Sequence, residues 1–210
     1  MVILLQKDST KLVRSPETPE QREDMTETTS HMRLYNELVQ RLYINASERE
    51  RFLKAACSQE VHIQAFCLTL VYTGCRLSEA REITKTSIQK DEQLIAIRSL
   101  KKRDKHHIRE IPVPKILIDL LLALDNEELW NIDRITAYRW VKQVMNEAGI
   151  YGPQACPKGL RHGFGIHAVL SGIQIHMLQK WMGHAHIRTT AIYATAVGRE
   201  EFKLAEQMWH

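Results

Sequence analysis

The sequence has no long uninterrupted apolar run. Its start is apolar only over residues 1–6, and no later run approaches 18 apolar residues. A membrane-spanning helix needs about 20 such residues, and six are too few for the apolar part of a secretory signal. We therefore expect a soluble protein of the cytoplasm that makes no membrane contact.

Cysteine is scarce and shows no paired spacing. The chain has four cysteines in 210 residues, and none of them forms a CxxC pair. Small disulfide-stabilised secreted domains are much denser in cysteine, so we expect reduced thiols in or near a core. The motifs His106-His107 and His184-Ala185-His186 lack spaced cysteine partners, so we predict no metal site.

The net charge is small, +4, but it is unevenly distributed along the chain. Residues 16–30 contain five acidic residues and one arginine, whereas residues 134–193 contain seven Lys or Arg, one acid and five histidines. A basic C-terminal half suits a polyanionic partner such as nucleic acid. A cationic surface without such a partner explains the charge equally well.

The first part of the chain divides into three segments. Residues 1–30 show no sustained period and are predicted to be flexible, and residues 31–44 are predicted to form a short helical lead-in. Ser47, with Glu50 three residues later, matches a capping box at the start of a helix. Residues 63–72 are strongly apolar and predict a central helix.

The second part is predicted to be mainly helical, with one hairpin. Residues 94–99 and 108–113 resemble two strands, and the link between them is basic. Helical patterns return beyond the hairpin, over residues 115–124, 135–148, 160–168, 173–181, 187–196 and 200–208. The fold class is therefore mainly α with a small antiparallel β-sheet (α+β).

Three short motifs follow one another along the chain. They are Thr-Gly-Cys-Arg-Leu-Ser-Glu at 73–79, Lys-Gly-Leu-Arg-His at 158–162, and Gly183-His184 followed nine residues later by Tyr193. In this order they resemble the catalytic domain of the tyrosine recombinases, the lambda-integrase-type site-specific DNA recombinases. The resemblance implies that residues 45–210 form such a catalytic domain without a full N-terminal core-binding domain.

The two motif arginines have the chemistry to clamp a phosphate. A guanidinium donates two parallel hydrogen bonds to phosphate oxygens, and Arg76 stands at a predicted helix start, where the backbone adds positive potential. Arg161 would be the second clamp on a pentacoordinate transition state. The alternatives are an ion pair of Arg76 with Glu79 or Glu82, and a solvent-facing Arg161.

The resemblance makes Tyr193 the nucleophile. Its attack would form a 3′-phosphotyrosyl link and free a 5′-hydroxyl, so the bond energy is kept and neither ATP nor a metal is needed. Because a phenol near pKa 10 is a poor nucleophile, nearby cations must favour the phenolate. The alternative is a core tyrosine. Tyr138 and Tyr151 fit less well, since neither follows a Gly-His motif.

The remaining site residues are also implied by the resemblance. Lys158 stands where many relatives carry histidine, and a lysine there stabilises charge better than it removes a proton. His184 resembles the second family histidine, and His162 is a supporting residue. Lys101, or else Lys102, would protonate the leaving 5′-oxygen.

Further basic residues are candidates for phosphate contacts along a duplex, which raise affinity without reading sequence. They are Arg103, Lys105, Arg139, Lys142 and Lys180. One departure is Thr195, where many relatives carry histidine two residues after the tyrosine. The tail over residues 200–208 has an apolar face, which would dock on a neighbouring protomer or fold back on its own domain.

These observations predict a site-specific recombinase that binds double-stranded DNA, works without a cofactor, and assembles as a homo-tetramer on two duplexes. A nucleoid-associated location and an accessory DNA-binding protein are further expectations. Two alternatives stay open: a DNA-binding regulator that has lost recombination, and a nicking-closing enzyme of the topoisomerase IB type. The sequence does not reveal the target site.

Overall fold

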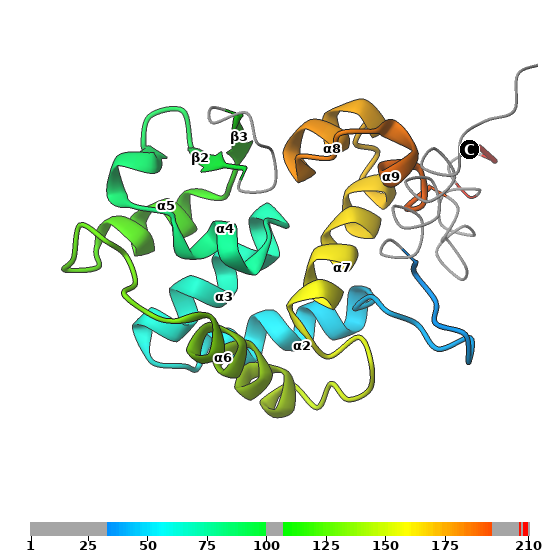
Figure 1. Cartoon of the computed structure of the whole chain (residues 1–210), viewed down its shortest axis with the longest axis horizontal. Coiled ribbons are helices and arrows are strands. Elements are labelled where there is room, and N and C mark those ends of the chain that lie inside the picture. The colour runs from blue at the N-terminus through cyan, green and yellow to red at the C-terminus, as the bar shows by residue number, and fades with distance from the viewer. Residues whose placement is uncertain (1–32, 100–106, 195–205, 207, 210) are drawn as a thin grey trace, which may run out of the picture. The chain divides into compact units, whose positions relative to one another are not determined.

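The computed structural model of the chain describes residues 33–99, 107–194, 206, 208 and 209. These residues form a mainly helical fold with a small sheet, as predicted (Figure 1). The elements in chain order are α2 (Ala46–Cys57), α3 (Val61–Thr73), α4 (Leu77–Arg81), the 3-10 turn η1 (Lys85–Ser87), β1 (Ile88–Gln89), β2 (Leu94–Arg98), β3 (Ile108–Pro112), α5 (Lys115–Leu122), α6 (Arg134–Glu147), α7 (Pro157–Leu170), α8 (Ile175–Met182) and α9 (Ile187–Ala191).

The sheet is antiparallel, with strand order β1-β2-β3. The two predicted strands are confirmed as β2 and β3, whereas β1 was not predicted because two residues carry no detectable alternation. Ile95 pairs with Ile111, and Ile97 pairs with Arg109. All four of these residues are buried, so they face the interior, as the period of two in a strand requires. A buried arginine on this face is the first sign of an internal polar network.

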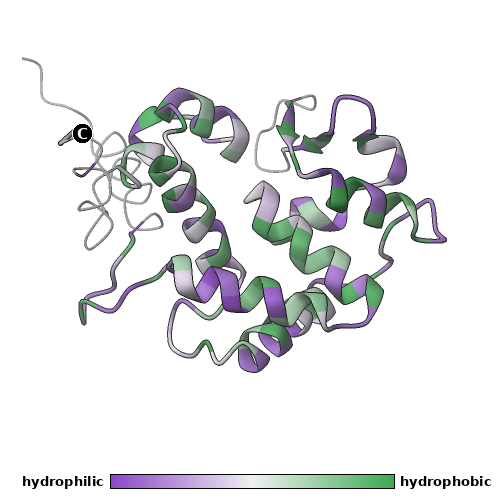
Figure 2. Ribbon diagram, turned by 180° about the vertical axis from the view of Figure 1, so that it is seen from behind, coloured by the Kyte–Doolittle hydropathy of each residue, from purple (hydrophilic) through white to green (hydrophobic). Residues whose placement is uncertain are grey.

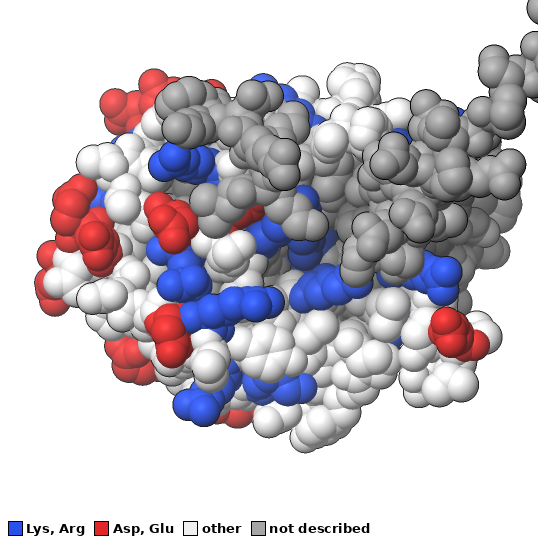
Figure 3. Space-filling view, in the orientation of Figure 1, with Lys and Arg blue, Asp and Glu red and all other residues white. Residues whose placement is uncertain are grey.

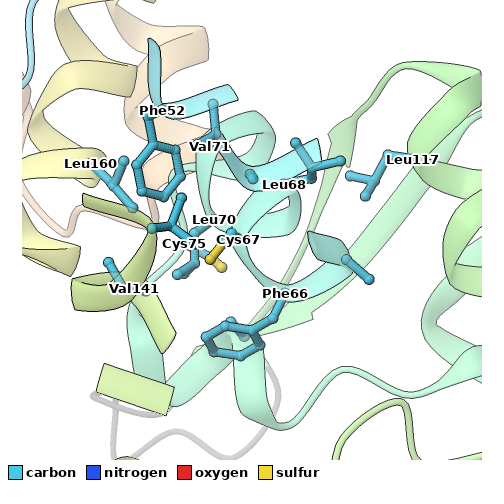
Figure 4. Packing of buried hydrophobic residues seen from close by; sticks show 14 of the residues in the cluster. Phe52, Phe66, Cys67, Leu68, Leu70, Val71, Cys75, Leu117, Val141 and Leu160 are labelled. Atoms are coloured by element: carbon cyan, nitrogen blue, oxygen red, sulfur yellow. The ribbon is translucent and has the colours of Figure 1, made fainter. Parts of the chain in front are cut away.

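Helix α3 forms the centre of the core. Phe66 and Cys67 are fully buried and Leu70 is nearly so, among apolar residues that α2, α6 and α7 contribute (Figure 4). Figure 2 colours α3 largely as hydrophobic, in agreement with the apolar run that predicted it. A helix that is apolar on all sides is expected to be covered by its neighbours.

Two predictions for the N-terminal part were wrong. Residues 33–44 contain no helix; Tyr35 and Arg41 instead form an isolated β-bridge around a turn. The cap of α2 is Asn45 rather than Ser47: its side chain accepts from the backbone N–H of Glu48, whose carboxylate accepts from the Asn45 N–H. The capping box is therefore present, two residues earlier than predicted.

Two glycines end helices immediately before site residues. Gly74 ends α3 and Gly183 ends α8, and both adopt the left-handed conformation, with φ of +59° and +64°. This conformation is strained for residues with a β-carbon, so glycine is the favoured residue at such helix ends. The resulting sharp turns place Arg76 and His184 just beyond each helix. None of the described helices is both long and apolar enough to cross a bilayer.

Candidate active site

Arg76 lies at the N-cap of α4, where it is tied to Glu79. Its backbone N–H donates to Glu79 Oε2 at 2.9 Å, and its Nη1 donates to Oε1 of the same carboxylate at 2.8 Å. The Arg76 side chain is 27% exposed, whereas that of Glu79 is completely buried. The ion pair considered as an alternative for Arg76 is thus present, and it fixes a guanidinium that stays partly open to solvent.

Arg161 is buried and held between two helix ends. It projects from α7, and its guanidinium donates to the carbonyl of Gly74 at 2.7 Å and to that of Met182 at 2.6 Å. A third contact joins Nη2 to His184 Nε2 at 3.0 Å. A solvent-facing Arg161 is therefore excluded. Three of its five N–H donors bond to described residues, which leaves two for a ligand.

The contacts of His184 define its tautomer. An arginine nitrogen only donates, so His184 Nε2 accepts from Arg161, and the ring proton lies on Nδ1. Nδ1 then donates to the Thr190 hydroxyl at 2.9 Å. Burial, together with the charges of Arg161 and Arg76, lowers the pKa of His184 to about 3, in agreement with a neutral ring. Thr190 at the end of α9 thus fixes the orientation of His184.

The Tyr193 hydroxyl meets His162 inside the fold. Tyr193 is 0% exposed and His162 is 1% exposed, and Tyr193 Oη lies 3.1 Å from His162 Nδ1. The pKa of His162 falls to about 3 because of burial and of the charges of Lys158 and Arg161. A neutral His162 is therefore hydrogen-bonded to the hydroxyl. Its other nitrogen, Nε2, has no hydrogen-bond partner within the part of the chain that the structure describes.

Opposing effects set the acidity of the tyrosine. Burial raises the pKa of Tyr193 to about 12, while the charges of Arg161 and Arg76 act to lower it. Both guanidiniums therefore lie within electrostatic reach of the phenol. The same cluster acts on Arg161, whose pKa is lowered to about 10 by burial and by the Arg76 charge. The site gathers positive charge around a neutral hydroxyl.

Gly165 makes room for the tyrosine ring. A β-carbon on Gly165 would lie 2.7 Å from two ring atoms of Tyr193, which is closer than van der Waals contact allows. Gly165 is in the interior of α7, where glycine costs helix stability. The glycine is explained by the close approach of the Tyr193 ring to the α7 backbone.

The structure brings together five of the residues predicted for the site: Arg76, Arg161, His162, His184 and Tyr193. Lys158 is exposed in the first turn of α7, and it acts on His162 through its charge. Lys101 and Lys102 lie outside the described residues, as do Arg103 and Lys105 of the same link.

Three of the residues predicted to contact DNA lie in the described part of the chain, and their exposure differs. Arg139 on α6 and Lys180 on α8 are exposed, whereas Lys142 is half-buried and donates to the Ala155 carbonyl at 2.9 Å. Figure 3 shows Lys and Arg side chains across the middle of one face and acidic side chains gathered toward its left edge. This face thus carries a band of basic side chains.

Sequence reasoning missed two partners within the site. Arg109 on β3 is 1% exposed and donates to Glu79 at 2.5 Å, so Glu79 bridges two arginines. The sequence did carry a signal for Arg109. Alternate residues of a strand face the same side of a sheet, so Arg109 was expected on the same inward face as Ile111. Thr190 had no comparable signal, since only the fold brings α9 to His184.

The chain is similar in sequence to known recombinases. Residues 129–198 match the model of the phage integrase family. A tyrosine recombinase of Thermosipho africanus is 26% identical over 149 residues, and XerA of Thermococcus kodakarensis is 28% identical over 179. These alignments cover 66% and 78% of this chain but only 51% and 61% of the two relatives.

Solved structures of recombinases are similar to this chain in fold. A crystal structure of XerA recombinase superposes with a TM-score of 0.69 at 25% identity, covering 79% of this chain and 64% of that one. A XerH recombinase bound to its palindromic difH substrate gives a TM-score of 0.66 at 21% identity, with coverage of 80% and 53%. The family model, the relatives and the fold point the same way. The chain is similar in sequence and in fold to the catalytic part of tyrosine recombinases.

Proposed function

We propose that this protein is a site-specific DNA recombinase that cleaves and rejoins strands through a 3′-phosphotyrosyl intermediate. The observation that carries the proposal is the convergence at Tyr193. Its hydroxyl is hydrogen-bonded to His162 and lies within reach of two guanidinium charges that come from α4 and α7. A tyrosine with only a packing role needs neither guanidinium nor a histidine partner for its hydroxyl.

Arg76 and Arg161 would bind the non-bridging oxygens of the scissile phosphate. Each is positioned before DNA arrives, Arg76 by Glu79 and Arg161 by the Gly74 and Met182 carbonyls. Donors that need no reorganisation stabilise developing charge most effectively. Two fixed cations therefore supply the charge that the pentacoordinate transition state requires.

The nucleophilic step begins at the Tyr193 hydroxyl. Its oxygen forms a bond to phosphorus while the bond from phosphorus to the 5′-oxygen breaks, and that oxygen takes up a proton. His162 holds the hydroxyl in place through Nδ1, and the bound phosphate would approach from the side of the arginines. The proton of the phenol would pass to His162 Nδ1 as the bond forms, because the neutral phenol is a weak nucleophile.

His184 would act by holding Arg161. Its Nε2 accepts from the guanidinium, and its Nδ1–H is directed to Thr190, so the ring bridges α7 and α9. This bridge connects the clamp to α9, which ends two residues before Tyr193. Lys158 adds positive charge at the edge of the site.

Lys101 or Lys102 would protonate the leaving 5′-oxygen. A duplex with sulfur in place of that oxygen tests the assignment, since a thiolate leaves without a proton. The lysine variant whose cleavage defect disappears with the sulfur substrate is the acid. A defect of equal size on both substrates would contradict the assignment for that lysine.

Double-stranded DNA is the proposed partner. Recombinases of similar fold include XerH, solved with its difH substrate, and the Tn1549 integrase, solved with a circular-intermediate DNA. We extend DNA binding to this chain, together with assembly of four protomers on two duplexes, help from an accessory DNA-binding protein, and association with the nucleoid. Exposed basic residues such as Arg139 and Lys180 would contact phosphates outside the site.

Covalent trapping tests the proposal. Nicked duplexes made from the DNA that flanks the gene lose a short strand after cleavage, so the adduct persists. We expect a denaturation-resistant adduct with the wild-type protein and none with Tyr193→Phe, which keeps the ring. Footprinting without an adduct would support a regulator, and relaxation of supercoils without exchange between two sites would support a nicking-closing enzyme.

A further inference from the structure

Arg109 is the largest fully buried side chain among the described residues. It crosses from β3 to three separate parts of the fold. Its Nε donates to the Trp181 carbonyl at 2.7 Å, its Nη1 to the Ser99 hydroxyl at 3.0 Å, and its Nη2 to Glu79 Oε2 at 2.5 Å. One guanidinium therefore joins the end of α8, the end of β2 and helix α4.

The surroundings of Arg109 are closely fitted. A β-carbon on Gly183 would lie 3.2 Å from the Arg109 Cζ, so the turn that leads to His184 packs against the guanidinium. A buried arginine with all three nitrogens bonded is expected to keep one orientation. Its Glu79 contact is therefore a fixed feature of the folded site.

Glu79 is shared between a buried and a partly exposed arginine. Its Oε2 accepts from Arg109 and from the Arg76 backbone, while its Oε1 accepts from the Arg76 guanidinium. Burial alone would raise the pKa of Glu79, but the charges of Arg109 and Arg76 and these hydrogen bonds bring it below the usual value. The carboxylate is therefore ionised, and its negative charge must be balanced within the fold.

We infer that Arg109 is a positioning residue that neutralises Glu79, so that Arg76 keeps its positive charge for the DNA phosphate. The inference rests on the proposed function and deepens it. In the described cluster, Arg76, Arg109 and Arg161 carry positive charge against the single carboxylate of Glu79. Without Arg109, Glu79 would be balanced by Arg76 alone, and Arg161 would be the remaining uncompensated cation at the phosphate.

This account differs from a purely structural role in what it predicts for the substrate. A phosphodiester is negatively charged, and its transition state is stabilised by nearby cations. A methylphosphonate linkage replaces one charged oxygen with a methyl group and so depends less on those cations. Loss of Arg109 should therefore slow cleavage of the phosphodiester far more than cleavage of the methylphosphonate.

The experiment compares Arg109→Met with the wild-type protein on two nicked duplexes that differ only in the linkage at the cleavage position. We expect adduct formation to fall roughly 100-fold on the phosphodiester, the effect typical of losing one preorganised donor, and less than roughly fivefold on the methylphosphonate. Arg109→Lys keeps the positive charge, so its rate of adduct formation on the phosphodiester should fall less than that of Arg109→Met. Thermal unfolding and equilibrium DNA binding check that each variant is folded.

A second variant keeps the test decisive if Arg109→Met unfolds. In Arg109→Met combined with Glu79→Gln, no buried carboxylate remains to be balanced, and we expect a phosphodiester rate within roughly tenfold of that of the wild-type protein. Equal losses on both linkages, or a greater loss in the double variant, would overturn the role of Arg109 while wild-type adduct formation stays intact. Absence of adduct with wild-type protein would instead overturn the proposed function and, with it, this inference.

Discussion

The Tyr193 hydroxyl and His162 Nδ1 lie 3.1 Å apart inside the fold, although 31 residues separate them in sequence. His162 is next to Arg161 on α7, so a single helix presents both a partner for the phenol and a cation for the phosphate. The α7 backbone thus carries both the hydrogen-bond partner of the proposed nucleophile and a cation proposed to stabilise its attack.

His162→Asn should lose less activity than His162→Leu. An asparagine side chain places a polar atom close to the position of Nδ1, while leucine leaves the Tyr193 hydroxyl without this partner. We expect the rate of adduct formation to fall about 10-fold in His162→Asn and at least about 100-fold in His162→Leu. The second loss is the lower end of the range for groups that assist proton transfer. Equal rates for the two variants would show that the hydrogen bond is not used.

Gly165→Ala should destabilise the protein when the Tyr193 ring is present and stabilise it when the ring is absent. In the wild-type background the new methyl collides with the ring, and we expect a loss of about 1–3 kcal/mol in the free energy of unfolding. In a Tyr193→Ala background the same change should stabilise α7 by about 0.5–1 kcal/mol through helix propensity. Denaturant unfolding of the four proteins measures both values, and an effect of the same sign in both backgrounds would contradict the predicted collision.

Thr190→Val should disturb His184 without changing the shape of α9. The valine removes the oxygen that accepts from His184 Nδ1, and a buried donor without a partner costs about 1–3 kcal/mol. Thr190→Ser keeps the oxygen and is the matched control. Nitrogen NMR of the His184 ring should show a protonated Nδ1 in the wild type and in Thr190→Ser. A ring protonated at Nε2 in the wild-type protein would show that the assigned tautomer is wrong.

Stability should fall as the pH drops below about 6.5. His162 and His184 have folded pKa values of about 3, against 6.5 for the exposed side chain. Between these values the unfolded chain binds more protons than the folded chain, so the free energy of unfolding rises with pH. Each such histidine adds a slope of up to about 1.4 kcal/mol per pH unit.

Denaturant unfolding at pH 5 and pH 7 measures this difference. The double variant His162→Asn with His184→Asn should show a shallower dependence, because it lacks both titrating rings. An unchanged slope in the double variant would show that the two histidines are not the source. Carboxylates change the free energy of unfolding chiefly below pH 5, so they affect the comparison between pH 5 and pH 7 little.

Sequence patterns predicted the long elements because each has either an apolar face or, in α3, a continuous apolar run. The apolar run of α3 and the alternation in β2 and β3 are local signals, and burial in the fold confirms them. The lead-in at 31–44 was wrong because its pattern was weak, and over 33–44 the chain forms a turn bridged by Tyr35 and Arg41 instead. Short elements such as β1 form through pairing with a neighbour, which a local pattern does not record.

The candidate site was predictable from its motifs only in part. Motif spacing predicted Arg76, Arg161 and Tyr193 as site residues. It did not predict the contacts that hold them, because those contacts join segments far apart in the sequence. Arg109 lies 30 residues from Glu79 and 72 from Trp181, and only the packed structure shows that it contacts both. The motif predicted a supporting position for His162, and the structure adds its hydrogen bond to the Tyr193 hydroxyl.

The central claim is tested most directly by identifying the residue that carries DNA after covalent trapping. The adduct is digested with protease and nuclease, and the modified peptide is sequenced by mass spectrometry. The account predicts a 3′-linked nucleotide on Tyr193 and a released strand that ends in a 5′-hydroxyl. A nucleotide on Tyr138 or Tyr151, or a link to the 5′ end of the cleaved strand, would contradict it.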